Sequence, residues 1–220
     1  MAVKIGSKAP NIHVSTWVQG KPTNIDAEKG NVVMIDVFQV NCPGCFLYGI
    51  PEAIELYHKF GGSGLTILGL ATAFEDYDKN TLENLQKLLT TGEVIGETQK
   101  AFAQYGHLKD GNKLPYKIPF PVGMDVLIKE SGQITDDKVM DFIEGAFPEF
   151  RTFGDRKKAD LKERVKEYLS HKEYTAKTFE QYALRGTPSV IIVDKKGKLR
   201  HTLFGASGQL ETIIQGLLDE

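Results

Sequence analysis

Apolar side chains follow the chain in two spacings, short continuous runs typical of strands and three- to four-residue spacing typical of helices. Residues 31–38 are an apolar run that contains one acid, Asp36. Such a run predicts a central strand covered on both faces. Residues 42–60 follow with apolar side chains at helical spacing, and residues 65–71 are the next run. A strand, a helix and a strand in this order predict two parallel strands.

The rest of the chain predicts further elements around this unit. Gly49 and Pro51 predict a kink inside the helix at 42–60. The last helix is expected to have Ser207 as its N-cap and an apolar face that runs from Leu210 to Leu218. The other expected elements are a strand at 11–18 paired with 21–25, helices at 81–89, 97–105 and 175–184, a strand at 119–125, and a hairpin of 189–193 with 199–204.

Residues 126–172 are predicted to be a helical insert within a single domain that spans residues 1–220. The insert has a charged helix at about 156–169, preceded by four phenylalanines: Phe142, Phe147, Phe150 and Phe153. We expect the phenylalanines to cover the domain's core or a dimer face rather than to line a substrate groove. The insert itself is a candidate for selecting a protein partner.

Composition narrows the classes of function. The chain has 220 residues, 41% of them hydrophobic and 25% charged, with a formal net charge of −2. This balance fits an ordinary globular protein and argues against nucleic acid or an anionic membrane as a partner. No apolar stretch approaches the roughly 18 residues of a membrane span, and the first residues do not resemble a signal peptide. The expectation is a soluble cytoplasmic monomer or homodimer, with a removed leader left open.

Two cysteines are present, Cys42 and Cys45. A disulfide between them would close a very small loop, so a structural staple is a poor explanation. A closed zinc site needs four ligands, and neither a second cysteine pair nor a paired histidine spacing is available. Redox chemistry therefore fits the pair better than metal binding, and no metal or other cofactor is expected.

The sequence Cys42-Pro43-Gly44-Cys45 follows a predicted strand and opens a predicted helix. The first turn of a helix presents unpaired N–H groups and a partial positive charge, and both favour a thiolate. Cys42 is the predicted attacking sulfur, and Cys45, one turn later, is predicted to resolve the mixed disulfide. Pro43 is tolerated here because the first helical residue needs no N–H donor.

Asp36 lies six residues before Cys42 in the apolar strand. Burial would raise the pKa of its carboxyl and suit it to accept a proton from Cys45. The alternative is an edge position with the carboxylate in water, which the continuous apolar run disfavours.

Three blocks resemble the thioredoxin superfamily, and in particular its TlpA-like and redoxin branch. They are residues 5–10 with the G-x-x-A-P opening, residues 32–45 with the strand, the acid and CxxC, and residues 185–194 with Gly-Thr-Pro. The resemblance implies an α/β thioredoxin-like fold, with a central mixed sheet flanked by helices, an N-terminal β extension and a helical insert. It also implies a cis Pro188 that faces the cysteines and helps to bind the substrate backbone, and Thr187, Pro43 and Gly44 are expected to border the same substrate.

The resemblance implies a thiol–disulfide oxidoreductase that acts on a disulfide-containing protein and is recycled by an external thiol reductant. Two alternatives stay open. One is a peroxiredoxin-like peroxidase with Cys42 peroxidatic and Cys45 resolving, although Gln39 stands where that family needs Thr or Ser. The other is a non-enzymatic binding protein of the same fold. Asn41 and Phe46 also depart from the residues usual beside the cysteines, so we expect an unusual partner.

Overall fold

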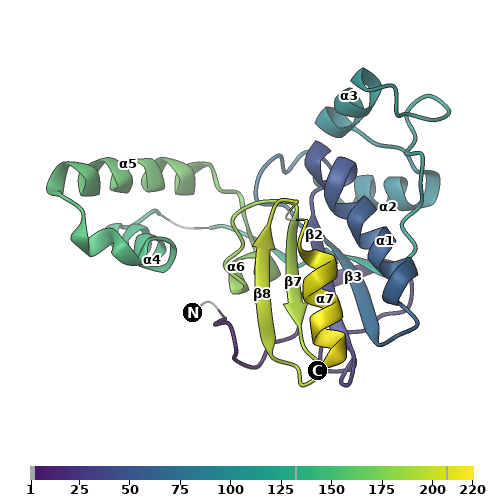
Figure 1. Ribbon diagram of the computed structural model, residues 1–220. Coiled ribbons are helices and arrows are strands. Elements are labelled where there is room, and N and C mark those ends of the chain that lie inside the picture. The colour runs from purple at the N-terminus through teal and green to yellow at the C-terminus, as the bar shows by residue number, and fades with distance from the viewer. Residues whose placement is uncertain (1–2, 132, 207) are drawn as a thin grey trace.

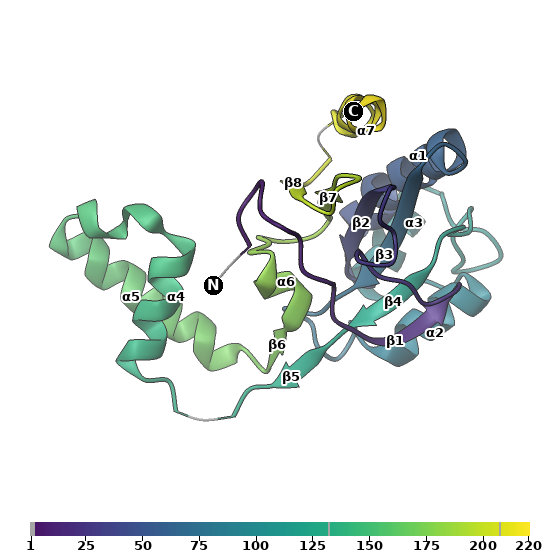
Figure 2. The same ribbon diagram turned by 90° about the horizontal axis from the view of Figure 1, so that it is seen from below.

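The computed structural model describes residues 3–131, 133–206 and 208–220, and its centre is a six-stranded mixed sheet with helices on both faces (Figures 1 and 2). The strand order is β1-β4-β3-β2-β7-β8. These strands are β1 (Val14–Gln19), β2 (Val32–Phe38), β3 (Leu65–Ala71), β4 (Val122–Asp125), β7 (Ser189–Val193) and β8 (Leu199–Phe204).

The predicted pair of parallel strands is present as β2 and β3, and β2 also pairs antiparallel with β7. Every residue of β2 is buried, as expected for a strand with neighbours on both edges and helices on both faces. The α/β fold class with a mixed sheet between helices is therefore confirmed.

The helices form two layers (Figures 1 and 2). Alternate residues of β2 point to opposite faces, so Val32, Met34 and Phe38 pack with α1 and α7, whereas Val33, Ile35 and Val37 pack with α6 and the N-terminal segment. The helices are α1 (Ile50–Phe60), α2 (Leu82–Thr91), α3 (Gly96–Gln104), α4 (Asp136–Ala146), α5 (Asp155–His171), α6 (Lys177–Gln181) and α7 (Leu210–Asp219).

The predicted pairing of residues 11–18 with 21–25 is wrong, because β1 pairs antiparallel with β4 and residues 21–25 form no strand. The side chain of Asn24 replaces a strand partner here. Its Oδ1 accepts from the Ile12 N–H (3.0 Å) and its Nδ2 donates to the Ile12 carbonyl (2.9 Å). Ile25 still reaches the core, which explains its apolar character without a strand.

The predicted helix at 175–184 is also wrong at its start. Residues Tyr174–Ala176 form β6, which pairs antiparallel with β5 (Leu127–Lys129), and the helix that follows is the short α6. The segment between β5 and β6, residues 130–173, contains α4, a 3₁₀ turn (Pro148–Thr152) and α5. We call this segment the arm and the rest of the chain the main body. The arm projects from the main body on a two-stranded ribbon (Figure 2).

The arm has a small hydrophobic cluster of its own, formed by buried Val139, Ile143, Phe150, Val165 and Leu169. The other three phenylalanines of the sequence pattern, Phe142, Phe147 and Phe153, pack against this cluster. These rings therefore cover the arm's own cluster and not the core of the main body, and the alternative of a dimer face stays a prediction.

Two remaining expectations concern the ends and the environment of the chain. The predicted N-cap Ser207 lies outside the described residues. Within the part of the chain that the structure describes, no helix has the length and apolar character to cross a bilayer.

Candidate functional site

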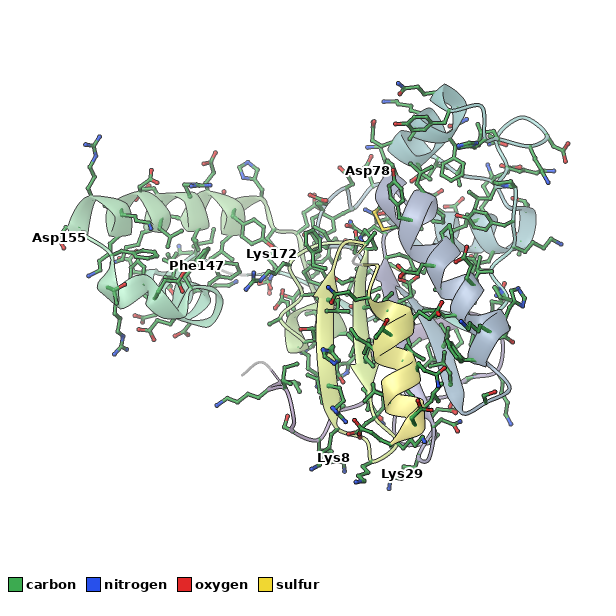
Figure 3. All side chains as sticks on the ribbon, viewed as in Figure 1. Lys8, Lys29, Asp78, Phe147, Asp155 and Lys172 are labelled. Atoms are coloured by element: carbon green, nitrogen blue, oxygen red, sulfur yellow. A yellow bond between two sulfur atoms is a disulfide. The ribbon has the colours of Figure 1, made fainter. Side chains whose placement is uncertain are left out.

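The site lies where β2 ends and the first helix begins. The chain becomes helical at Pro43, and Cys42 and Cys45 form a disulfide with a Cα–Cα distance of 5.4 Å. Cys42 stands immediately before the helix, so its sulfur is at the end that carries the partial positive charge. Figure 3 draws the disulfide as a yellow bond in the upper half of the main body, just below the label of Asp78.

The two sulfurs have different surroundings. Cys42 is half-buried, whereas Cys45 is fully buried. The Cys45 N–H donates to Cys42 Sγ at 3.2 Å. In the reduced protein the same N–H is placed to stabilise a Cys42 thiolate, because hydrogen bonds to the charged form lower a pKa. The geometry makes Cys42 the accessible sulfur and Cys45 the sulfur behind it.

Pro188 packs directly against the CxxC helix, and the Thr187–Pro188 peptide bond is cis, as the resemblance implied. The Thr187 carbonyl oxygen lies 3.6 Å from Cys42 Sγ. A Cβ at Gly44 would lie 3.7 Å from Pro188 Cδ, and a Cβ at Gly49 would lie 2.8 Å from Pro188 Cβ. The distance of 3.7 Å is an ordinary contact, but real Cβ atoms do not come as close as 2.8 Å. Glycine at position 49 therefore allows the helix to pack directly against Pro188.

The expected kink takes the form of a π-helical turn, Cys45–Gly49, that runs into α1. In a π-helix each carbonyl accepts from the N–H five residues later. The partner of the Phe46 carbonyl would be residue 51, which is proline and has no N–H. Tyr116 supplies the missing donor through its hydroxyl group. A residue far along the chain thus supports the helix that carries the cysteines.

Asp36 is fully buried on the α1 face of β2, and neither carboxylate oxygen has a hydrogen-bond partner among the described residues. Burial, with a smaller contribution from the charge of Glu52, raises the pKa of Asp36 to about 7. A Cβ at Gly49 would lie 3.7 Å from Asp36 Oδ1, so the acid lies directly behind the π-helical turn. The alternative of an edge position in water is wrong. The carboxyl can exchange a proton near neutral pH, as a general base for Cys45 requires.

Two amides that sequence reasoning noted only as departures connect the site to neighbouring loops. Gln39 is buried; its Oε1 accepts from the Thr187 hydroxyl (3.1 Å) and its Nε2 donates to the Glu75 carbonyl (3.3 Å). Asn41 Nδ2 donates to Asp76 Oδ2 (2.6 Å), and Asn41 Oδ1 accepts from the Glu97 N–H at the start of α3 (2.7 Å). The sequence offered one signal for these two residues, because polar side chains directly after a buried strand often belong to a functional site.

Metal chemistry gains no support from the side-chain arrangement. Among residues 3–131, 133–206 and 208–220, no group of three or more His, Cys, Asp or Glu side chains is placed to hold a metal ion.

Taken together, the sheet order, the CxxC disulfide at a helix start and the facing cis-proline define a thioredoxin-like protein. A solved thioredoxin-like superfamily protein is 25% identical, with 97% of each chain covered and a TM-score of 0.58. A thiol-disulfide isomerase from Corynebacterium glutamicum is 24% identical, with a TM-score of 0.59, over 98% of this chain and 97% of that one. No protein-family model and no curated protein sequence matches the chain.

These likenesses confirm the resemblance to the thioredoxin superfamily that the sequence motifs indicated. The chain has the fold of thiol–disulfide oxidoreductases and a Cys-x-x-Cys pair at bonding distance. The branch of the superfamily, the partner and the roles of individual residues stay predictions.

Proposed function

We propose that this protein is a thiol–disulfide oxidoreductase that exchanges disulfides with protein partners through Cys42 and Cys45. The observation that carries the proposal is the disulfide at a helix start, with its accessible sulfur 3.6 Å from the carbonyl before the cis-proline. A thiolate is favoured at that position, and a partner chain that lies along Thr187 and Pro188 would bring its sulfur to Cys42.

In the reducing direction the reaction has two thiol–disulfide exchange steps. The Cys42 thiolate attacks one sulfur of the partner disulfide, which forms a mixed disulfide and releases the first partner thiolate. Cys45 then loses its proton and attacks Cys42 Sγ, which forms the Cys42–Cys45 bond and releases the second thiolate. Two electrons pass to the partner, and an external dithiol or two thiols must then reduce the Cys42–Cys45 bond, leaving as a disulfide.

Asp36 is proposed as the group that takes the proton from Cys45. A carboxyl with a pKa of about 7 is present in both protonation states near neutral pH, so it can accept the proton during reduction and return it when the reaction runs backwards. Thr187, Pro188, Pro43 and Gly44 are proposed to border the partner segment, because the Thr187 carbonyl lies 3.6 Å from Cys42 Sγ, Gly44 faces Pro188, and Pro43 follows Cys42 in the chain.

The experiment is reduction of insulin by dithiothreitol, followed by turbidity, with wild type, Cys42→Ser and Cys45→Ser. Wild type should accelerate precipitation and both variants should lose the acceleration. Cys45→Ser, reduced beforehand and freed of dithiothreitol, should in addition trap a mixed disulfide with insulin through Cys42, visible on a non-reducing gel. Wild-type kinetics equal to dithiothreitol alone would reject the proposal in favour of a binding protein with idle cysteines.

The peroxidase alternative has weaker support. The Gln39 amide stands in place of the hydroxyl that a peroxide site needs, and its two polar atoms are already engaged by Thr187 and Glu75. Stopped-flow measurement of Cys42 thiolate loss in hydrogen peroxide separates the two functions, and we expect a rate no greater than that of free cysteine.

A further inference from the structure

A large cleft lies between the arm and the main body, with a volume of about 990 Å³. This volume is at the upper end of the roughly 300–1,000 Å³ of small-molecule pockets. The loop after β3, residues 74–78, and the segment from Phe179 to Arg185 contribute one side, and the arm contributes the other. Figure 3 labels Asp78 on the main body, Phe147 on the arm and Lys172 where the two meet.

Aromatic rings line the cleft from both sides. Phe74 and Phe179 stack with ring centroids 4.5 Å apart on the main body. Phe142 and Tyr168 contact each other on the arm, with centroids 5.4 Å apart. The faces of such rings attract cations.

Carboxylates outnumber cations around these rings. Five acids line the cleft: Glu75, Asp76, Asp78, Glu149 and Glu173. The permanent cations of the lining are Lys172 and Arg185, and Lys172 is already paired with Glu180.

Four of the five acids form no salt bridge with any cation in the described part of the chain: Glu75, Asp76, Glu149 and Glu173. Asp76 instead accepts a hydrogen bond from the Asn41 amide. The closeness of these negative charges affects Glu75, whose pKa is raised by partial burial and by the charge of Asp76. A surplus of negative charge over aromatic faces is complementary to a basic side chain.

The cleft is connected to the redox site by short steps. Gln39 bonds both the Glu75 carbonyl and the Thr187 hydroxyl, and the Thr187 carbonyl lies 3.6 Å from Cys42 Sγ. Arg185 of the lining precedes Thr187 by two residues, a separation of at most about 7 Å along the chain. A polypeptide whose cystine lies at Cys42 can therefore extend into the cleft within a few residues.

We infer that the cleft between arm and main body binds the segment of a substrate polypeptide next to its cystine, and that it selects segments that carry lysine or arginine. The inference rests on the proposed function and names its substrate class. The acids of the cleft and the aromatic pairs, which come from both the main body and the arm, recognise the basic side chain.

The test uses three cystine peptides that are identical except for lysine, glutamine or glutamate two positions on either side of the cystine. Single-turnover reduction by the full, reduced protein gives kcat/KM for each. We expect lysine to exceed glutamate by about tenfold at low salt and the ratio to shrink as salt rises. In the variant Glu75→Gln/Glu173→Gln the ratio should fall below about threefold, because attraction to the cleft is weakened.

The matched control is Glu163→Gln/Glu167→Gln, which removes the same charge from exposed positions on α5 that do not line the cleft. This control should keep the wild-type ratio. Equal reduction of the three peptides by wild type overturns the inference and leaves the proposed function standing. An equal fall of the ratio in both variants places the preference outside the cleft and also overturns it. If wild type reduces none of the peptides, the proposed function fails and the inference with it.

Discussion

The main body and the arm are held together in different ways. In the main body, two hydrophobic clusters meet across a fully buried strand, β2, which carries helices on both faces. In the arm, α4 and α5 cover a single small cluster of five buried residues, and the arm is joined to the main body by the β5–β6 ribbon and by the ion pair of Lys172 with Glu180. The groups of the redox site come from the main body, whereas the arm supplies one wall of the cleft.

This division matches what each region has to do. Exchange at Cys42 needs the sulfur, the helix start and Pro188 fixed relative to one another, and the tight packing around Gly49 fixes them. Binding of a polypeptide segment does not require the arm, which forms one side of the cleft, to be rigid. Small clusters bury little apolar surface, so we expect the arm to open with a lower free energy than the main body. The following predictions test that difference.

The largest effect is expected from the buried acid of the main body. Because the folded pKa of Asp36 is about 7 against a usual 3.8, the folded protein holds this proton when the unfolded chain has lost it. The contribution of Asp36 to the free energy of unfolding therefore falls as pH rises from about 4 to 7, by on the order of 4 kcal/mol. Asp36→Asn should remove this fall, which urea unfolding of the oxidised protein at pH 4 and pH 8 would show.

Asp137→Asn is the matched control in the arm, since Asp137 is exposed in the first turn of α4. The helix dipole favours an acid there by only roughly 0.3–1 kcal/mol. Replacing Asp137 should therefore leave the fall of the free energy of unfolding between pH 4 and pH 8 close to that of wild type. A fall that survives in Asp36→Asn would show that some other group causes it.

The second prediction compares two fully buried isoleucines, Ile191 in β7 and Ile143 in α4. Ile191→Ala leaves a cavity beside β2 and should lower the global free energy of unfolding by about 3 kcal/mol. Ile143→Ala should leave the global transition within about 0.5 kcal/mol and accelerate amide hydrogen exchange only in the arm. Equal losses in the global transition would show that arm and main body unfold as one unit.

The third prediction compares two helical glycines. A Cβ at Gly49 would lie 2.8 Å from Pro188 Cβ, whereas a Cβ at Gly145 in α4 meets nothing within 4 Å. Gly49→Ala should destabilise the protein by about 1–3 kcal/mol through overpacking, and Gly145→Ala should stabilise α4 by up to about 1 kcal/mol. Thermal unfolding of the main body and hydrogen exchange in α4 measure the two effects. Loss of stability in both variants would contradict the packing argument.

These contrasts also explain which features the sequence could predict. The local pattern of apolar residues predicts three elements: the strand at 31–38, the CxxC helix and the strand at 65–71. It does so because these elements follow one another in the chain and pack against one another. The sequence also predicts the long helix α5, whose buried positions Val165 and Leu169 are four residues apart and therefore lie on one face.

The features that escaped prediction depend on partners distant in sequence. Residues 174–176 have their strand partner at 127–129, across the whole arm. Asn24 takes the place of a strand with one amide, which no hydrophobic pattern can signal. Tyr116 completes the hydrogen bonding of a helix 70 positions earlier. In the site, the motif located the sulfurs and the acid, but the connections through Gln39 and Asn41 required the folded chain.

The smallest effect is expected from replacing the arm. The variant has a short turn between β5 and β6 in place of residues 130–173. It lacks one side of the cleft but keeps the groups around Cys42. The reason is that no residue of the arm contributes to the described contacts of Cys42, Cys45 or Asp36. The equilibrium constant of the cysteine pair with glutathione should then change by less than about twofold, well under the 30 mV that corresponds to tenfold. The ratio of kcat/KM for the lysine peptide to that for the glutamate peptide should also fall, because the arm side of the cleft is missing. A shift of the redox equilibrium beyond tenfold in a variant with an intact circular dichroism spectrum would mean that the arm acts on the chemistry itself, and the division between the two regions would have to be abandoned.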